Sequence, residues 1–183
     1  GYWSGKKLYA ASATVRAKYR AAVLARGYTR IYFDVFEGLA GHDFFGDPKA
    51  LVPYLQECLA DGLGCVPFVI PEGDRAAQKR YDIGKGKVSV KYLNALKRFV
   101  RICGPYCSDI VIGVETDEVL RPDAPNDGSA EDHAATDVCE ALVTKIGQAI
   151  RSALAALTGQ RKPPRVTELW VHWTTGWHGQ WSW

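Results

Sequence analysis

Short apolar segments alternate with helix-like segments along most of the chain, and this alternation restricts the possible folds more than any other feature. β-branched and aromatic residues are concentrated near 31–36, 65–70, 109–115 and 168–173, a pattern typical of strands. The segments between them keep a helical spacing of apolar residues over roughly 12 to 25 residues. Strands joined by such helices form parallel βαβ units. The sequence therefore predicts an α/β fold around a parallel sheet.

The helix boundaries follow from glycine, proline and capping residues. A first helix is expected over 8–26, ending at Gly27, with an inner face of Leu8, Val15, Tyr19, Ala22 and Val23. Asp47 and Pro48 are a suitable start for the second helix, although Pro53 would make it begin late or kink. Ser89 is expected to cap the third helix. The longest helix is expected to run to Gly159 on an apolar face of Val138, Leu142, Ile146, Ile150, Leu154 and Leu157.

Two architectures fit this order of elements, an open doubly wound sheet and a closed barrel. Neither a Gly-x-Gly-x-x-Gly nor a Gly-x₄-Gly-Lys-Ser/Thr motif occurs, so the usual evidence for a nucleotide-binding open sheet is missing. We therefore expect a parallel (β/α) barrel resembling a TIM barrel, with strands adjacent in chain order. A full barrel takes about 250 residues. The chain has 183 residues and no methionine, so we expect 1–183 to be a single barrel-like domain, incomplete here and part of a longer chain.

Composition narrows the classes of partner. Net charge is +3, and basic residues interspersed with acidic ones argue against nucleic acid. No apolar run approaches a membrane span. Cys58, Cys65 and Cys139 lie in apolar segments typical of buried thiols. Cys103 and Cys107 could pair across their turn or stay reduced, but they lack zinc-ligand spacing. We expect no metal site and no cofactor.

Carboxylates and aromatic residues follow the predicted strands, at the edge where barrel enzymes place their active sites. Carboxylates hydrogen-bond sugar hydroxyls or move protons, and indole rings stack on sugar faces. The mixture favours a carbohydrate ligand. In chain order these residues are Asp34 and Glu37, then Glu72 and Asp74, then Glu115, Asp117 and Glu118, then His172, Trp173, Trp177 and His178.

Residues Ile112–Glu118 spell Ile-Gly-Val-Glu-Thr-Asp-Glu, which resembles the fourth-strand motif Gly-x-Glu-x-Asn-Glu of the clan of retaining glycoside hydrolases with (β/α)₈ barrels. The resemblance implies that Glu118 is the catalytic acid/base and Glu115 a supporting catalytic carboxylate. Asp117 stands where the clan has asparagine. This change replaces an amide donor with an acceptor, and its charge would shift the proton affinity of Glu118.

The segment Val171–Gly179, with His172, Trp173 and Trp177, is similar to the His-and-aromatic segment that ends a later strand in that clan. Along its whole length, the chain more loosely resembles glycoside-hydrolase-like domains of bacteriophage virion proteins. The resemblance implies a polysaccharide or cell-surface glycan as partner, and an extracellular or virion-associated location. It also implies a nucleophilic glutamate after strand seven, whereas at most five strands are expected here.

Each of these residues also has a structural explanation. Glu115 and Glu118 could face solvent or form ion pairs, and His172 could be a hydrogen-bonded rim histidine. The tryptophans Trp173, Trp177, Trp181 and Trp183 could pack against other parts of a barrel. Asp34 and Glu72 are expected to contact the substrate. The alternative function is a non-catalytic barrel domain that serves as a structural or glycan-binding part of a larger assembly, such as a phage virion.

Overall fold

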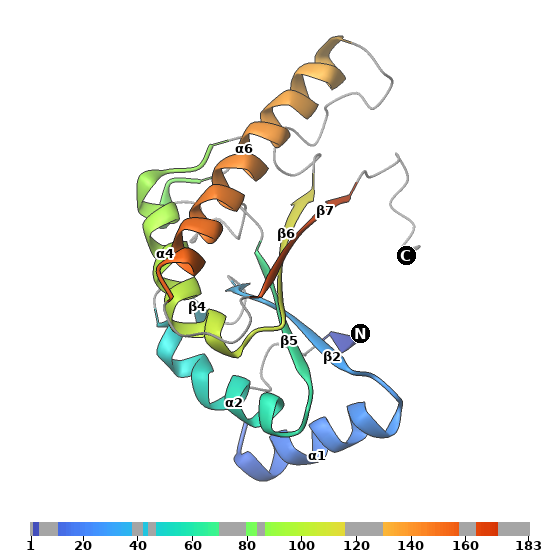
Figure 1. Ribbon diagram of the computed structural model, residues 1–183. Coiled ribbons are helices and arrows are strands. Elements are labelled where there is room, and N and C mark those ends of the chain that lie inside the picture. Colours follow the sequence, from blue (N-terminus) through green and yellow to red (C-terminus); the bar gives the residue numbers. More distant parts are fainter. Residues whose placement is uncertain are drawn as a thin grey trace.

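The computed structural model describes residues 2–3, 11–37, 42–43, 47–69, 80–83, 87–115, 130–157 and 164–171. Five strands form one sheet (Figure 1). Neighbouring strands are parallel, and their order across the sheet is the order in which these five strands occur along the chain. The predicted α/β class and the adjacency of the four main strands are therefore confirmed. The strands are β1 (Tyr2–Trp3), β2 (Arg30–Asp34), β5 (Gly64–Val69), β6 (Asp109–Glu115) and β7 (Arg165–Val171).

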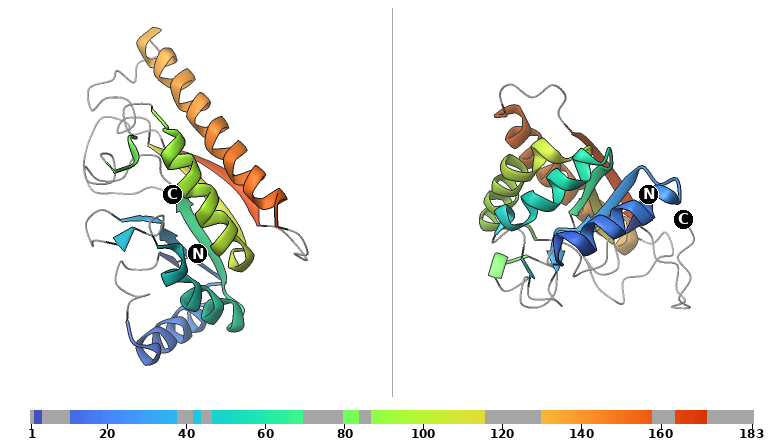
Figure 2. Two further views of the ribbon diagram at one scale, coloured as in Figure 1. Left: turned by 90° about the vertical axis from the view of Figure 1, so that its left-hand side faces the viewer. Right: turned by 90° about the horizontal axis from the view of Figure 1, so that it is seen from below.

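A helix lies in each connection between adjacent strands of this sheet. Side chains from all four helices join alternate residues of β2, β5 and β6, such as Ile31, Cys65 and Ile110, in one core. The helices therefore cover the same face of the sheet (Figures 1 and 2). They are α1 (Ala13–Ala25), α2 (Val52–Ala60) with the preceding 3₁₀ helix η1 (Pro48–Leu51), α4 (Val90–Cys103) with the following 3₁₀ helix η2 (Gly104–Tyr106), and α6 (Ala130–Ala155).

The opposite face of the sheet carries a second, smaller apolar cluster. Val66, Phe68 and Val111 are buried there, and Tyr32 packs against them. Burial of both faces is usual for parallel sheets. Among the described strands, no pairing closes β7 onto β1. The architecture established is thus an α/β parallel sheet with its described helices on one face.

Most predicted helix ends are correct, but the first helix differs from expectation. The backbone N–H of Tyr92 donates to Ser89 Oγ at the start of α4, and Gly27 ends α1 in a left-handed conformation with φ +76°. The predicted helix over 8–26 instead begins at Ala13, where Ser12 caps it. Val15, expected inside, is 50% exposed. The buried residues of α1 are Arg20 and Val23, and the burial of an arginine is explained below.

Two prolines shape the middle of the chain. Pro53 falls in the first turn of α2, where its missing N–H removes no intrahelical bond, and the α-helix begins late, as predicted. Pro67 lies inside the central strand β5, paired with Phe33 of β2. Proline cannot donate to a ladder, and the register between β5 and β6 begins only at the next residue, Phe68.

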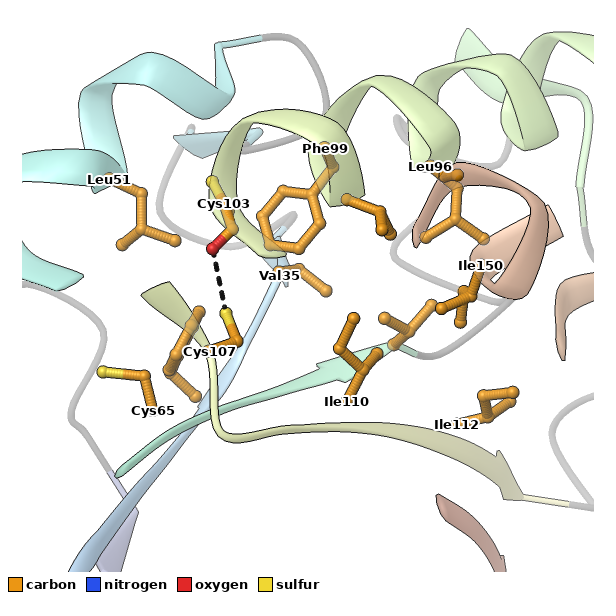
Figure 3. Close-up of a cluster of buried hydrophobic side chains, with 14 of the residues drawn as sticks. Val35, Leu51, Cys65, Leu96, Phe99, Cys103, Cys107, Ile110, Ile112 and Ile150 are labelled. Carbon is orange, nitrogen blue, oxygen red and sulfur yellow. Dashed lines mark hydrogen bonds between the residues drawn. The ribbon is translucent and has the colours of Figure 1, made fainter. Parts of the chain in front are cut away.

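Buried side chains of α4 pack against the sheet in the main core. Phe99 and Leu96 of α4 are fully buried and face Ile110 and Ile112 of β6 (Figure 3). Ile150 of α6 joins the same cluster. This packing fixes α4 and α6 against β6 and β7. In the described ranges, no helix is long and apolar enough to cross a membrane.

Candidate functional site

The carboxyl ends of the parallel strands lie at one edge of the sheet, and two of the predicted site residues occupy strand ends. Asp34 is the last residue of β2, and Glu115 is the last residue of β6. Glu115 is paired with Val171, the last residue of β7 and the residue before His172. The carboxyl ends of β6 and β7 therefore lie side by side at this edge of the sheet.

The strand ends do not lie level across the sheet. Phe68 of β5 is paired with both Asp34 and Val111, so Glu115 lies four residues further along the sheet than Asp34. Two strand spacings and four residues of rise place these two Cα atoms about 16 Å apart in a flat sheet. A retaining pair of carboxyl groups needs a separation of about 5 to 5.5 Å. Asp34 is thus not the partner of Glu115 in such a pair.

A short antiparallel hairpin follows β2 and was not expected. β3 (Phe36–Glu37) pairs with β4 (His42–Asp43), and its register places Glu37 opposite His42. His42 thus lies in a strand and is paired through its backbone with β3. Residues directly opposite each other on antiparallel strands have Cα atoms about 4.5 to 5.5 Å apart. A carboxylate and an imidazole residue thus occupy neighbouring positions beside the carboxyl end of β2.

The sequence contained a signal for this hairpin. Glycines at 38 and 41 flank Leu39 and Ala40, and a connection of this length containing glycine is common between hairpin strands. The remaining predicted site residues lie outside the described residues. They are Glu72, Asp74, Asp117, Glu118, His172, Trp173, Trp177 and His178.

The strongest ion-pair network of the described chain is on α1 and α2, away from the strand ends. Arg16 donates to both carboxylate oxygens of Glu57, at 2.8 and 2.5 Å. Arg20 donates to Glu57 and Asp61, both at 2.5 Å. The hydrogen bond to Glu57 raises the pKa of Arg16, and the same bond lowers the pKa of Glu57. All four groups satisfy one another between two helices, so the network is structural.

Four of the five cysteines are buried free thiols. Cys103 and Cys107, which could have formed a disulfide, instead hydrogen-bond to carbonyl oxygens. Cys107 Sγ donates to the Cys103 carbonyl at 3.3 Å (Figure 3), and Cys103 Sγ donates to the Pro48 carbonyl at 3.3 Å. Burial raises the pKa of Cys103 to about 12, and burial also raises the pKa of Cys107. Such thiols are inert core groups. Within the described ranges, no three His, Cys, Asp or Glu residues could together hold a metal ion.

Comparison with known proteins gives no family assignment. No family model matches the chain, and no curated protein matches it.

Proposed function

We propose that this chain is part of a (β/α) barrel of the glycoside-hydrolase-like kind, which binds or cleaves a polysaccharide at the carboxyl ends of its strands. Glu118 is the proposed acid/base and Glu115 its supporting carboxylate. Asp34, Glu72, Asp117, His172, Trp173 and Trp177 are the proposed sugar contacts. The observation that carries the proposal is the arrangement of the sheet: parallel strands in chain order with every described crossover helix on one face.

This arrangement supports a barrel over a doubly wound sheet. A doubly wound sheet reverses its strand order and carries helices on both faces, whereas a barrel adds strands in one direction and keeps its helices outside. The stagger of the strand ends agrees with a barrel wall, because tilted strands must shift in register to close. Val66, Phe68 and Val111, buried opposite the helices, would then belong to the filled interior of the barrel.

The positions of the carboxylates support a site at the strand ends. Residues alternate between the faces of a strand. Asp34 is two residues after Tyr32, and Glu115 is four residues after Val111, so both positions are an even number of residues from members of the cluster opposite the helices. Residues 115–140 contain nine Asp or Glu and a single Arg. Such a concentration of negative charge repels anionic sugars, so we propose a neutral or amino-sugar glycan as the ligand.

The alternative is a non-catalytic glycan-binding or structural domain of a larger assembly. The observation that favours it is Asp117, which stands where the retaining clan has asparagine. An aspartate cannot donate a hydrogen bond to the sugar 2-hydroxyl when ionised. A second negative charge beside Glu118 would also favour the protonated form of one of the two carboxyls.

The test compares the parent with Glu118→Gln on a panel of neutral and amino-sugar polysaccharides, measuring released reducing ends. The exchange removes the proton donor and keeps the side-chain shape, so cleavage should fall by on the order of 10²–10⁴-fold while oligosaccharide affinity stays within a few-fold. Glu140→Gln, at an exposed position of α6, is the matched control and should cleave like the parent.

Unchanged cleavage by Glu118→Gln would remove Glu118 from the mechanism. If the parent cleaves nothing but binds glycans of the panel, the alternative of a non-catalytic domain is supported. A parent that neither binds nor cleaves any member of the panel would refute the glycan proposal altogether.

A further inference from the structure

Two long segments of the chain contain no acidic residue. Residues 83–108 and 141–167 together carry eleven Lys or Arg and neither Asp nor Glu. All 20 acidic residues and the other 12 basic residues lie outside these segments, which gives the rest of the chain a net charge of −8. The small net charge of +3 therefore hides a strong separation of charge. The expectation that basic residues are interspersed with acidic ones is wrong for these two segments.

The fold places the two acid-free segments side by side. Residues 90–103 form α4, and residues 141–155 form the C-terminal part of α6; these helices pack against each other on the outside of the sheet (Figure 2, left). Their ends are level, because a Cβ at Gly104, just after α4, would lie 3.4 Å from Leu154 and 3.8 Å from Leu157. One continuous outer surface thus combines the cations of both helices.

The cations on this surface are accessible. The exposed ones are Lys91, Arg98, Arg101, Lys145 and Arg151, and Lys97 is half-buried. The ion pairs of Arg16 and Arg20 with Glu57 and Asp61, and of Arg30 with Asp109, belong to other elements. The nearest described carboxylates on adjoining elements are Asp47 before η1, which packs on α4, and Glu140 at the upper end of the surface. Lys49 of η1 adds a further exposed cation.

Repulsion between these cations destabilises the folded protein, and a surface that mixes both signs of charge would avoid it. Lys97 and Arg101 are four residues apart on α4, and like charges at this spacing destabilise a helix. Ordinary protein surfaces intersperse both signs. A row of cations about 20 Å long, given a rise of 1.5 Å per residue, is suited to a chain that carries many negative charges.

We propose that the outer surface of α4 and the C-terminal part of α6 binds an anionic glycan chain. The cationic surface itself does not depend on the proposed function, but the choice of a glycan over a nucleic acid rests on it. The aromatic residues of α4, Tyr92 and Phe99, are fully buried, so neither is available to stack on a base. The outer surface of α4 and α6 would hold the domain on an anionic polysaccharide, while the acidic strand ends engage a different glycan, the neutral or amino-sugar ligand proposed above.

The test measures binding to polygalacturonate, and separately to a 20-base-pair DNA duplex, from 50 to 300 mM NaCl. The parent should bind polygalacturonate, with affinity falling steeply as salt increases. Lys91→Glu/Lys145→Glu places two reversed charges at exposed positions of the two helices and should weaken binding by at least about tenfold at 50 mM salt. Lys18→Glu/Arg26→Glu reverses two exposed charges on α1 and should bind like the parent. Circular dichroism verifies that both variants are folded.

Equal losses in the two double variants would show that only net charge matters and would overturn the proposal. Tighter binding to the duplex than to polygalacturonate would identify nucleic acid as the partner class and overturn it as well. Failure to bind polygalacturonate at 50 mM salt has the same consequence. The proposed function fails separately, through Glu118→Gln cleaving as the parent does, because that exchange leaves α4 and α6 unaltered.

Discussion

Replacing Glu57 with glutamine would remove the charge that joins α1 to α2. The carboxylate accepts hydrogen bonds from Arg16 and Arg20, and these side chains are only 15% and 8% exposed, against 26% for Glu57. Charge-assisted bonds contribute about 1.5 to 3 kcal/mol when buried, and partial exposure reduces this to about 1 to 2 kcal/mol. Arg16 and Arg20 are also four residues apart, so losing the carboxylate leaves a repulsion of about 0.2 to 0.5 kcal/mol.

The Glu57→Gln variant should therefore lose about 1 to 2.5 kcal/mol of unfolding free energy at pH 7. At about 2 to 4 °C per kcal/mol for a chain of this size, Tm should fall by roughly 2 to 10 °C. Urea unfolding followed by circular dichroism, together with a thermal scan, measures both quantities. Glu140→Gln removes an exposed carboxylate of α6 and is the control, expected within about 0.5 kcal/mol of the parent.

The pH dependence gives the sharper test. The pKa of Glu57 is lowered in the folded state by its hydrogen bond from Arg16, so its contribution is complete above the unfolded-state pKa of about 4.3. It is lost as the pH falls through the lower, folded-state pKa. Glutamine does not titrate, so the stability gap between parent and variant should narrow progressively as the pH falls below about 4.3. A gap that does not narrow between pH 5 and pH 3, or that matches the Glu140→Gln control at pH 7, would refute the ion-pair explanation.

Two further predictions concern the backbone and the thiols. Gly27→Ala should lower the free energy of unfolding by about 1 kcal/mol, because φ is +76° and an L side chain is strained in that conformation. Nothing lies within 4 Å of the added Cβ, so no clash contributes, and Gly27→Asn should cost less. Equal stability of glycine and alanine in urea unfolding would contradict this. Iodoacetamide at pH 8 should leave Cys58, Cys65, Cys103 and Cys107 unmodified in the native protein, because all four are buried and burial raises the pKa of Cys103 to about 12. Peptide mass spectrometry measures the alkylation. If any of the four is alkylated within minutes without denaturant, the described packing is wrong.

The order and direction of the strands could be predicted because each depends on local patterns. Apolar runs such as Ile31–Phe33, separated by helices, allow few connections other than parallel crossovers. The inner face of α1 could not be predicted in the same way. Its buried Arg20 is stabilised by Glu57 and Asp61, which are about forty positions away along the chain. The spacing of apolar residues along a helix does not indicate which distant residues will pair with its charged side chains.

For the candidate site, the sequence predicted the edge of the sheet but not the geometry of the residues there. Strand ends follow from strand periodicity, which located Asp34 and Glu115 at the correct edge. The stagger between these two residues depends on pairing register. Register follows from how the hydrophobic patterns of neighbouring strands match and from the connections between them, so the sequence of one strand alone does not contain it. The pairing of Glu37 with His42 likewise depends on a turn, whose glycines were visible but whose strands are only two residues long.

The chain-order pairing of the sheet has a consequence for how the protein is made. Within the five-stranded sheet, each strand after β1 pairs with a strand that precedes it along the chain. During synthesis, β2 is available before β5 emerges, and β5 before β6, so every new helix and strand meets an already exposed edge on which to dock. Domains form from the N-terminus during translation at roughly 5 to 20 residues per second. A ribosome that has released β6 but not yet β7 therefore carries a sheet whose growing edge is β6, and that edge stays open to aggregation until the residues of α6 and β7 have been added.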